Sequence, residues 1–308
     1  MKIFALRSIG VRGVPDGSYS LCPASVDPSQ GAPDRAHDRV LIVGPSASGK
    51  TRLLELIVAI REVISPSDER IEQDPFVRIG NNTSRAVLTL WLDEDERTQI
   101  GSSQPLIDAE VVFNGDGLEE QHAGLVFLFD RYAHDDQTPK LEYFSEKRRL
   151  DIGGGDISLG EERQKRYRTS TSVRKLGFLP RFMDSLPKRP EQARRFARGV
   201  ASLARALRYD VERHALRSAE RTIEDLTELS ASEADAVSFA ATAALVGLSR
   251  SIVLVDRPEL HGLDPVRAFE GICALGEDNQ VIAATSAPEL YQGFQGGVIT
   301  LDGAAKRL

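Results

Sequence analysis

The chain has 308 residues, of which 41% are hydrophobic, so it can bury a sizeable core in one large domain or in a domain with an insertion. No apolar run is long enough to span a membrane, and the first residues lack the apolar stretch of a signal peptide, which predicts a cytoplasmic protein without membrane contact. The net charge of −7 conceals a basic stretch, because residues 146–217 hold 19 Lys and Arg against 9 Asp and Glu. This stretch is either a set of solvated helix faces or a basic surface for nucleic acid or an acidic partner.

The first 64 residues predict two short strands, a loop, a buried strand and a helix. Residues 2–21 alternate apolar and polar side chains around a Gly/Pro turn, as expected for a pair of strands. A loop rich in Pro, Asp, Ser and Gly leads to the apolar run at 40–43, and apolar residues at helical spacing continue to about residue 64. A buried strand is therefore expected before the segment at 44–52, and a helix is expected from Lys50 to about Ile64.

That segment fills every fixed position of the phosphate-binding pattern G-x-x-x-x-G-K-[ST]. The residues predicted to line a nucleotide site are Gly44, Pro45, Ser46, Ala47, Ser48, Gly49, Lys50, Thr51 and Arg52. Glycines let the backbone turn tightly and point N–H groups at an anion, and the N-terminus of the next helix adds its dipole. We expect Lys50 to contact the β- and γ-phosphates and the Thr51 hydroxyl to bind Mg²⁺.

Residues 65–150 predict a β-rich arm. Four stretches are enriched in branched and aromatic residues and separated by polar turns, which is typical of an antiparallel meander: 86–92, 106–113, 124–129 and 140–144. The acidic turn at 130–140 is expected to be a solvated loop rather than a metal site.

Residues 151–224 predict a basic, mainly helical insertion. It opens with a polar, Gly-rich connector that reaches residue 172. Between 190 and 207 apolar side chains recur on one face at helical spacing, with arginines on the other faces. The stretch at 210–229 also has the pattern of a helix.

The last third predicts an alternation of helices and buried strands. Helices are expected at 233–248 and 266–275, and strands at 251–255, 280–285 and 297–301. Such an alternation implies a mostly parallel sheet, so the fold class is α/β. Residues 1–64 and 225–308 together would form its nucleotide-binding core.

Three motifs in this last third resemble those of ABC-type ATPases. Leu-Ser-Ala-Ser-Glu at 229–233 is similar to the LSGGQ signature, which also precedes a helix. SIVLVDRPELHGLDP at 251–265 resembles the Walker B segment of the SMC, RecF and OLD ATPases, and QVIAATSAPEL at 280–290 resembles their switch segment. The opening strands also look like theirs. The chain is thus similar to an ABC-type P-loop ATPase of the SMC/RecF/OLD-like branch.

This resemblance implies an ATPase head with ATP and Mg²⁺ as cofactors, carrying the β meander and the helical insertion. It also implies a homodimer in which each ATP lies between the phosphate loop of one subunit and Ser230 and Ser232 of the other. Asp256 takes the Walker B position and is expected to bind Mg²⁺ together with Thr51. Without its neighbours, the motif at 229–233 would instead be read as an ordinary helix cap.

The motifs depart from the family where water is activated. Arg257 stands at the position of the catalytic Glu, Ser286 at that of the switch His, and Ser232 at that of the signature Gly. Because Arg stays protonated, it cannot act as a general base. The predicted catalytic residues are therefore Lys50, Asp256 and, as a substitute carboxylate, Glu259, with hydrolysis slow or absent.

The sequence thus favours a nucleotide-dependent dimerising switch in DNA maintenance or phage defence, with a nucleic acid or an effector protein bound through 146–217. The alternative is a regulatory or scaffold pseudo-ATPase in which the nucleotide is structural. The ATPase subunit of a membrane transporter fits less well, because a β meander with basic helices is a poor receptor for a coupling helix. The glutamine that usually joins the γ-phosphate to the inserted domain is not identified, and Gln164 is a candidate only by elimination.

Overall fold

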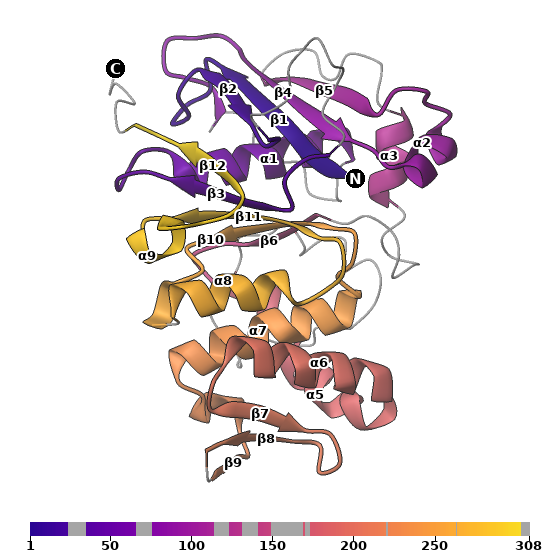
Figure 1. Ribbon diagram of the computed structural model, residues 1–308, viewed down its shortest axis with the longest axis vertical. Helices are drawn as coiled ribbons and strands as arrows, with labels where there is room; N and C mark the ends of the chain where they lie inside the picture. Colours follow the sequence, from indigo (N-terminus) through magenta and orange to yellow (C-terminus); the bar gives the residue numbers. More distant parts are fainter. Residues whose placement is uncertain are drawn as a thin grey trace.

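The computed structural model describes residues 1–23, 35–65, 76–113, 123–130, 141–148, 169, 173–219, 221–262 and 264–302. These residues form layers that follow one another along the long axis of the molecule (Figure 1). An antiparallel sheet comes first, then a helix, a parallel sheet, a group of helices and a small antiparallel sheet. In the part of the chain described, no helix is both long and apolar enough to cross a membrane.

The first layer is a four-stranded antiparallel sheet of order β2-β1-β4-β5. Its strands are β1 (Lys2–Ile9), β2 (Gly17–Ser20), β4 (Ser84–Trp91) and β5 (Leu106–Phe113). Every second residue of β4 is buried, as expected where one face of a sheet meets the core. The strands predicted at 86–92 and 106–113 are β4 and β5, and they pair in antiparallel as expected. Helices α2 (Glu94–Ile100) and α3 (Ala123–Asp130) lie beside this sheet (Figure 1).

The central layer is a parallel sheet of order β12-β3-β11-β10-β6. Its strands are β3 (Arg39–Val43), β6 (Leu141–Phe144), β10 (Ile252–Asp256), β11 (Gln280–Thr285) and β12 (Gly297–Thr300). Every residue of β6, β10 and β11 is buried, which explains the unbroken apolar runs in the sequence. The carboxyl ends of these strands therefore meet at one edge of the sheet.

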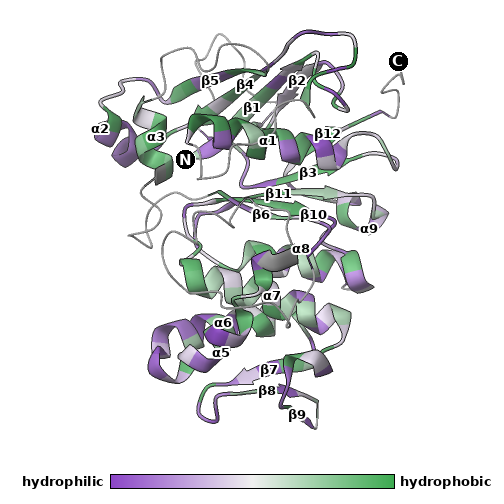
Figure 2. Ribbon diagram, turned by 180° about the vertical axis from the view of Figure 1, so that it is seen from behind, coloured by the Kyte–Doolittle hydropathy of each residue, from purple (hydrophilic) through white to green (hydrophobic). Residues whose placement is uncertain are grey.

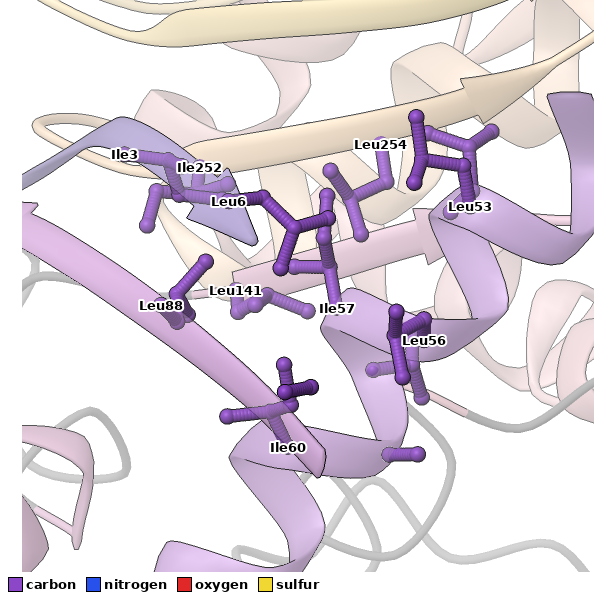
Figure 3. Packing of buried hydrophobic residues seen from close by; sticks show 14 of the residues in the cluster. Ile3, Leu6, Leu53, Leu56, Ile57, Ile60, Leu88, Leu141, Ile252 and Leu254 are labelled. Carbon is purple, nitrogen blue, oxygen red and sulfur yellow. The ribbon is translucent and has the colours of Figure 1, made fainter. Parts of the chain in front are cut away.

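Helix α1 (Lys50–Ile64) fills the space between the two sheets. Figure 3 shows its apolar side chains packed against residues of both sheets: Leu53, Leu56, Ile57 and Ile60 beside Ile3, Leu6, Leu88, Leu141, Ile252 and Leu254. The helix starts at Lys50, within the phosphate-binding pattern, and ends at Ile64, as predicted. Packing on two sides fixes the direction in which the start of α1 points.

The side-chain amide of Gln280 also joins the two sheets. Its Oε1 accepts a hydrogen bond from the backbone N–H of Ile3 at 2.6 Å, and its Nε2 donates to the carbonyl oxygen of Ile3 at 2.8 Å. The same Nε2 donates to the carbonyl oxygen of His37 at 3.0 Å. Gln280 is fully buried, so these bonds satisfy a polar group that would otherwise be costly inside the core.

Helices cover the other face of the parallel sheet (Figure 1). They are α5 (Leu179–Ser185), α6 (Pro190–Leu203), α7 (Ala231–Val246), α8 (Pro265–Cys273) and α9 (Pro288–Tyr291). Short 3₁₀ turns lie at Val173–Leu176, Leu186–Lys188, Leu226–Glu228 and Leu260–Gly262. A second core forms here, in which the Phe196 ring lies 5.6 Å from that of Phe182 and 5.0 Å from that of Tyr209. Figure 2 shows α7 as largely hydrophobic and much of α5 and α6 as hydrophilic.

The small sheet at the far end holds β7 (Leu207–Asp210), β8 (Ala215–Ser218) and β9 (Arg221–Ile223), all antiparallel. This corrects the helix predicted at 210–229. Besides Leu207, three buried side chains of the sheet recur every seven residues, a spacing that also fits two helical turns: Tyr209, Leu216 and Ile223. The connections take left-handed backbone at His214 and Ala219, with φ of 51° and 50°, and this reverses the chain.

Two further predictions concern the β meander. Residues 124–129, predicted as a strand, lie in α3, because a short unbroken apolar run fits either element. Residues 141–144 are a strand, but β6 pairs in parallel with β10 instead of joining the antiparallel sheet. The acidic turn at 130–140, the connector at 150–172 and Gln164 fall almost wholly outside the described residues.

Candidate nucleotide-binding site

Two glycines allow the phosphate loop to pass from β3 to α1. Gly49 has a φ of +99°, and a Cβ there would lie 2.4 Å from the carbonyl oxygen of Gly13. A Cβ at Gly44 would lie 2.4 Å from the carbonyl oxygen of Leu301. Both glycines of the sequence pattern are therefore required, because a larger residue would clash with backbone. The middle of the loop is exposed: Pro45, Ser46 and Ala47.

The Lys50 side chain lies folded against its own loop. Its Nζ donates to the carbonyl oxygens of Gly44 at 2.8 Å and Pro45 at 2.7 Å. Desolvation lowers the pKa of the Lys50 ammonium, and the charges of Asp256 and Glu259 oppose that shift. The cation is thus held at the mouth of the loop, where phosphate oxygens can replace the two carbonyl acceptors.

Asp256 ends β10 with a buried carboxyl that is 1% exposed. Its Oδ2 has no hydrogen-bond partner among the described residues. Burial raises the pKa of Asp256 to about 6, and a hydrogen bond with the Thr51 side chain opposes the rise. A carboxylate oxygen without a partner, next to a hydroxyl, supplies the hard oxygen ligands that Mg²⁺ prefers. Thr51 and Asp256 therefore fit Mg²⁺, either directly or through water.

Glu259 is fastened to the end of β11. The Thr285 hydroxyl donates to its Oε2 at 3.1 Å and accepts from the backbone N–H of Ala287 at 3.0 Å. Thr285 pairs with Val43, which directly precedes the phosphate loop, and the Glu259 charge opposes the lowering of the Lys50 pKa. The structure thus brings this predicted carboxylate to the phosphate loop, while Ser286 lies exposed just after β11.

The cation after Asp256 has a carboxylate beside it. Arg257 takes left-handed backbone with a φ of 52°, and its side chain is half exposed. Its Nη1 lies 3.8 Å from Oε2 of Glu146, which follows β6. Because β6 pairs with β10, the two charges come from neighbouring strand ends. Glu146 also contributes to the raised pKa of Asp256, after burial.

A buried arginine fastens these strand ends together. Nη1 of Arg148 donates to the carbonyl oxygens of Ser145 at 3.1 Å and Asp256 at 2.7 Å. Its Nη2 donates to the carbonyl oxygen of Arg257 at 2.7 Å. Arg148 thereby holds the carbonyl groups of the two peptides on either side of Arg257.

The signature motif forms the start of α7. Ser230 caps the helix and accepts from the backbone N–H of Glu233, and Glu233 accepts in return from the backbone N–H of Ser230 at 3.0 Å. Ser230 is exposed and Ser232 is partly exposed, and their hydroxyl oxygens lie 3.4 Å apart. Among the described residues, no hydrogen bond or ion pair joins either serine to the phosphate loop. The motif is thus a capping box that leaves its hydroxyl groups at the surface.

Arg52 points to the turn after β1. Its Nη1 lies 2.8 Å from Oε2 of Glu55, its Nε donates to the carbonyl oxygen of Arg12 at 3.3 Å, and its guanidinium lies 4.3 Å from the centre of the Phe76 ring. These contacts tie α1 to the turn that also approaches Gly49.

Glu146 and Arg148 were missed in the sequence. A signal was present, since both follow the apolar strand at 141–144. Ligands of open α/β sheets bind beyond the carboxyl ends of the strands. Assigning 141–144 to the parallel sheet would have placed both residues at the edge that carries the phosphate loop.

No protein-family model and no curated protein matches the chain. Among solved structures, an SMC head bound to the C-winged helix domain of ScpA is similar, with a TM-score of 0.54 at 13% identity, covering 94% of this chain and 91% of that one. An SMC head domain from Thermotoga maritima aligns at a TM-score of 0.46 and 15% identity, over 93% and 90% of the two chains. ATP-bound RecF aligns at a TM-score of 0.46 and 12% identity, over 98% and 97%.

The fold is therefore that of an SMC head, an ABC-type P-loop ATPase architecture, as the motifs predicted. At 13% identity the likeness shows the fold alone.

Proposed function

We propose that the chain binds Mg²⁺-ATP and acts as a nucleotide-dependent dimerising switch whose hydrolysis is slow or absent. The convergence of Lys50, Thr51 and Asp256 at one edge of the parallel sheet supports the proposal most strongly. The buried Oδ2 of Asp256, without a partner among the described residues, adds a place for a cation. This edge is where open α/β sheets bind their ligands.

Each side chain would have a distinct part in binding. Lys50 would leave the carbonyls of its loop for the β- and γ-phosphates, while backbone N–H groups of residues 44–51 surround them. Thr51 and Asp256 would hold Mg²⁺, which draws charge from the phosphate oxygens when bound. Glu259, held by Thr285, would lie near the γ-phosphate and connect it to the end of β11.

The signature supports the dimer. Ser230 lies exposed and Ser232 partly exposed at the N-terminus of α7, a helix of 16 residues, and such an end attracts anions. Neither serine contacts the phosphate loop of its own chain in the part described. We therefore assign them to the nucleotide of a second copy, so that ATP would join two subunits.

Slow hydrolysis follows from Arg257. A cation at this position cannot take a proton from water, and loss of a general base costs roughly 10²- to 10⁴-fold in rate. Glu146 and Glu259 remain at the same edge, one beside Arg257 and one beside Thr285. The presence of Arg257 in place of a general base also favours the alternative of a regulatory pseudo-ATPase, in which bound nucleotide is purely structural.

A basic surface supports a nucleic-acid or acidic protein partner. Arginines lie exposed along α6 and just beyond it: Arg194, Arg198, Arg205 and Arg208. Exposed arginine side chains attract phosphates and carboxylates alike. We propose that the switch binds such a partner through residues 146–217 and acts in DNA maintenance or phage defence.

The test measures ATP turnover together with molar mass, with and without Mg²⁺-ATP. We expect the wild type to dimerise on ATP with little turnover, and Lys50→Ala to do neither. Arg257→Glu places a carboxylate next to Asp256, and the added change Glu146→Gln removes the carboxylate that would otherwise lie beside the new one. Turnover of this double variant should rise at least about tenfold. A wild type that turns over rapidly would contradict slow hydrolysis, and one that binds no ATP would contradict the proposal as a whole.

A further inference from the structure

Arg148 is a buried cation to which the proposed function gives no part. It is 5% exposed, and besides the three strand-end carbonyls it reaches α7. Its Nε donates to Oδ2 of Asp235 at 3.2 Å, and its guanidinium lies 5.1 Å from the centre of the Phe239 ring. One planar group thus contacts the end of β10 on one side and the signature helix on the other.

Asp235 is the acceptor on α7, and it is also buried, at 3% exposed. It lies five residues after the capping Ser230, which is less than one and a half helical turns. Nδ1 of His261 lies 3.0 Å from the same Oδ2, and His261 belongs to the segment that follows Arg257. A displacement of Asp235 therefore moves the start of α7, where Ser230 and Ser232 lie.

The guanidinium suits this place because its donors have fixed directions. A planar fork that holds three carbonyls and a carboxylate makes the end of β10 and the start of α7 move together. A lysine would keep the positive charge but would lack the fixed directions of the guanidinium N–H donors. Burial strengthens the constraint, since a buried charge that loses one partner has no water to replace it.

We propose that Arg148 is a positioning residue that couples the Mg²⁺-ATP site of its own chain to the signature end of α7. Nucleotide binding at Lys50 and Asp256 would shift the end of β10, and Arg148 would pass that shift to the surface offered to the second subunit. The inference rests on the proposed function, because it assigns α7 to the nucleotide of the partner.

Hydrogen exchange with and without Mg²⁺ and a non-hydrolysable ATP analogue tests the coupling. It is measured at a concentration at which light scattering shows monomer, so that dimer contacts do not contribute. In the wild type we expect slower exchange of the phosphate-loop amides and an altered rate, by about fivefold or more, at 229–236. In Arg148→Gln and Asp235→Asn the loop should still be protected while 229–236 no longer respond. Arg148→Lys should give an intermediate response.

The matched control is Arg61→Gln. Arg61 is also a buried arginine, at 4% exposed, which is paired with Glu62 at the end of α1 and contacts the carbonyl oxygen of Ser65 and the ring of Phe129 in α3. It should leave the response of 229–236 intact. Asp235→Asn keeps the shape of the side chain, so it decides the matter if Arg148→Gln fails to fold.

The outcomes separate two failures. A wild type that binds no analogue contradicts the proposed function, and the inference falls with it. Analogue binding without any change at 229–236, or an undiminished change in Asp235→Asn, overturns the inference alone.

Discussion

The Asp256 carboxyl is buried, has an oxygen without a described partner, and has a pKa of about 6 against an ordinary value of 3.8. A folded-state pKa above the unfolded one means that protonation favours the fold. The stabilisation by protonated Asp256 is complete below about pH 4 and is lost as the pH rises through about 6. The free energy of unfolding falls by on the order of 3 kcal/mol over this range. In the protein free of nucleotide, the ionised Asp256 carboxylate therefore destabilises the fold at neutral pH, and a bound cation would remove this destabilisation.

Asp256→Asn should separate stability from binding. The amide has the shape of the carboxyl without its charge, so the unliganded variant should be more stable by about 1–3 kcal/mol near pH 7.5. Near pH 4.5 the gain should shrink, because wild-type Asp256 is then protonated. Denaturant unfolding at the two pH values measures this, and Mg²⁺-dependent ATP binding should be lost in the same variant. A variant less stable than the wild type at both pH values would show that the carboxylate is held by partners.

Elements whose signals are local could be predicted from the sequence. Helix α1 begins at Lys50 because the loop before it needs two glycines, and its apolar spacing continues to Ile64. Elements defined by distant partners could not. The run at 141–144 is a strand by composition, but only pairing with β10 places Glu146 beside Arg257. Arg148 was missed for the same reason, since its acceptors lie far along the chain.

Helix α6 should carry nucleic-acid affinity if its arginines form the partner surface. Arg194 and Arg198 lie one turn apart on its exposed side, and Phe196 between them is buried. The double variant Arg194→Glu, Arg198→Glu should weaken binding at least about tenfold and flatten its dependence on salt. Fluorescence anisotropy with labelled DNA at several salt concentrations measures both. The control is Arg85→Glu on β4, which makes the same change of charge at a single position. Equal losses of DNA affinity in both variants would remove α6 from the interface.

At the scale of the whole molecule, the proposed dimer predicts complementation. Lys50→Ala lacks a working phosphate loop but keeps its signature, whereas Ser232→Arg keeps its loop and blocks its signature. Neither alone should dimerise on ATP. A mixture should form a heterodimer with one complete site, detectable by analytical ultracentrifugation with one labelled chain. Dimerisation of Ser232→Arg alone would show that the signature does not face the partner's nucleotide.

The amide of Gln280 has a mechanical consequence. Its three hydrogen bonds to Ile3 and His37, together with α1 between the sheets, leave the antiparallel and parallel sheets little freedom to slide against each other. The two sheets then behave as a single rigid body. Relative motion is then left to the helical side, where α6, α7 and α8 pack on the opposite face. We expect these helices to move as a group against the parallel sheet, with the link between Arg148 and Asp235 as the pivot.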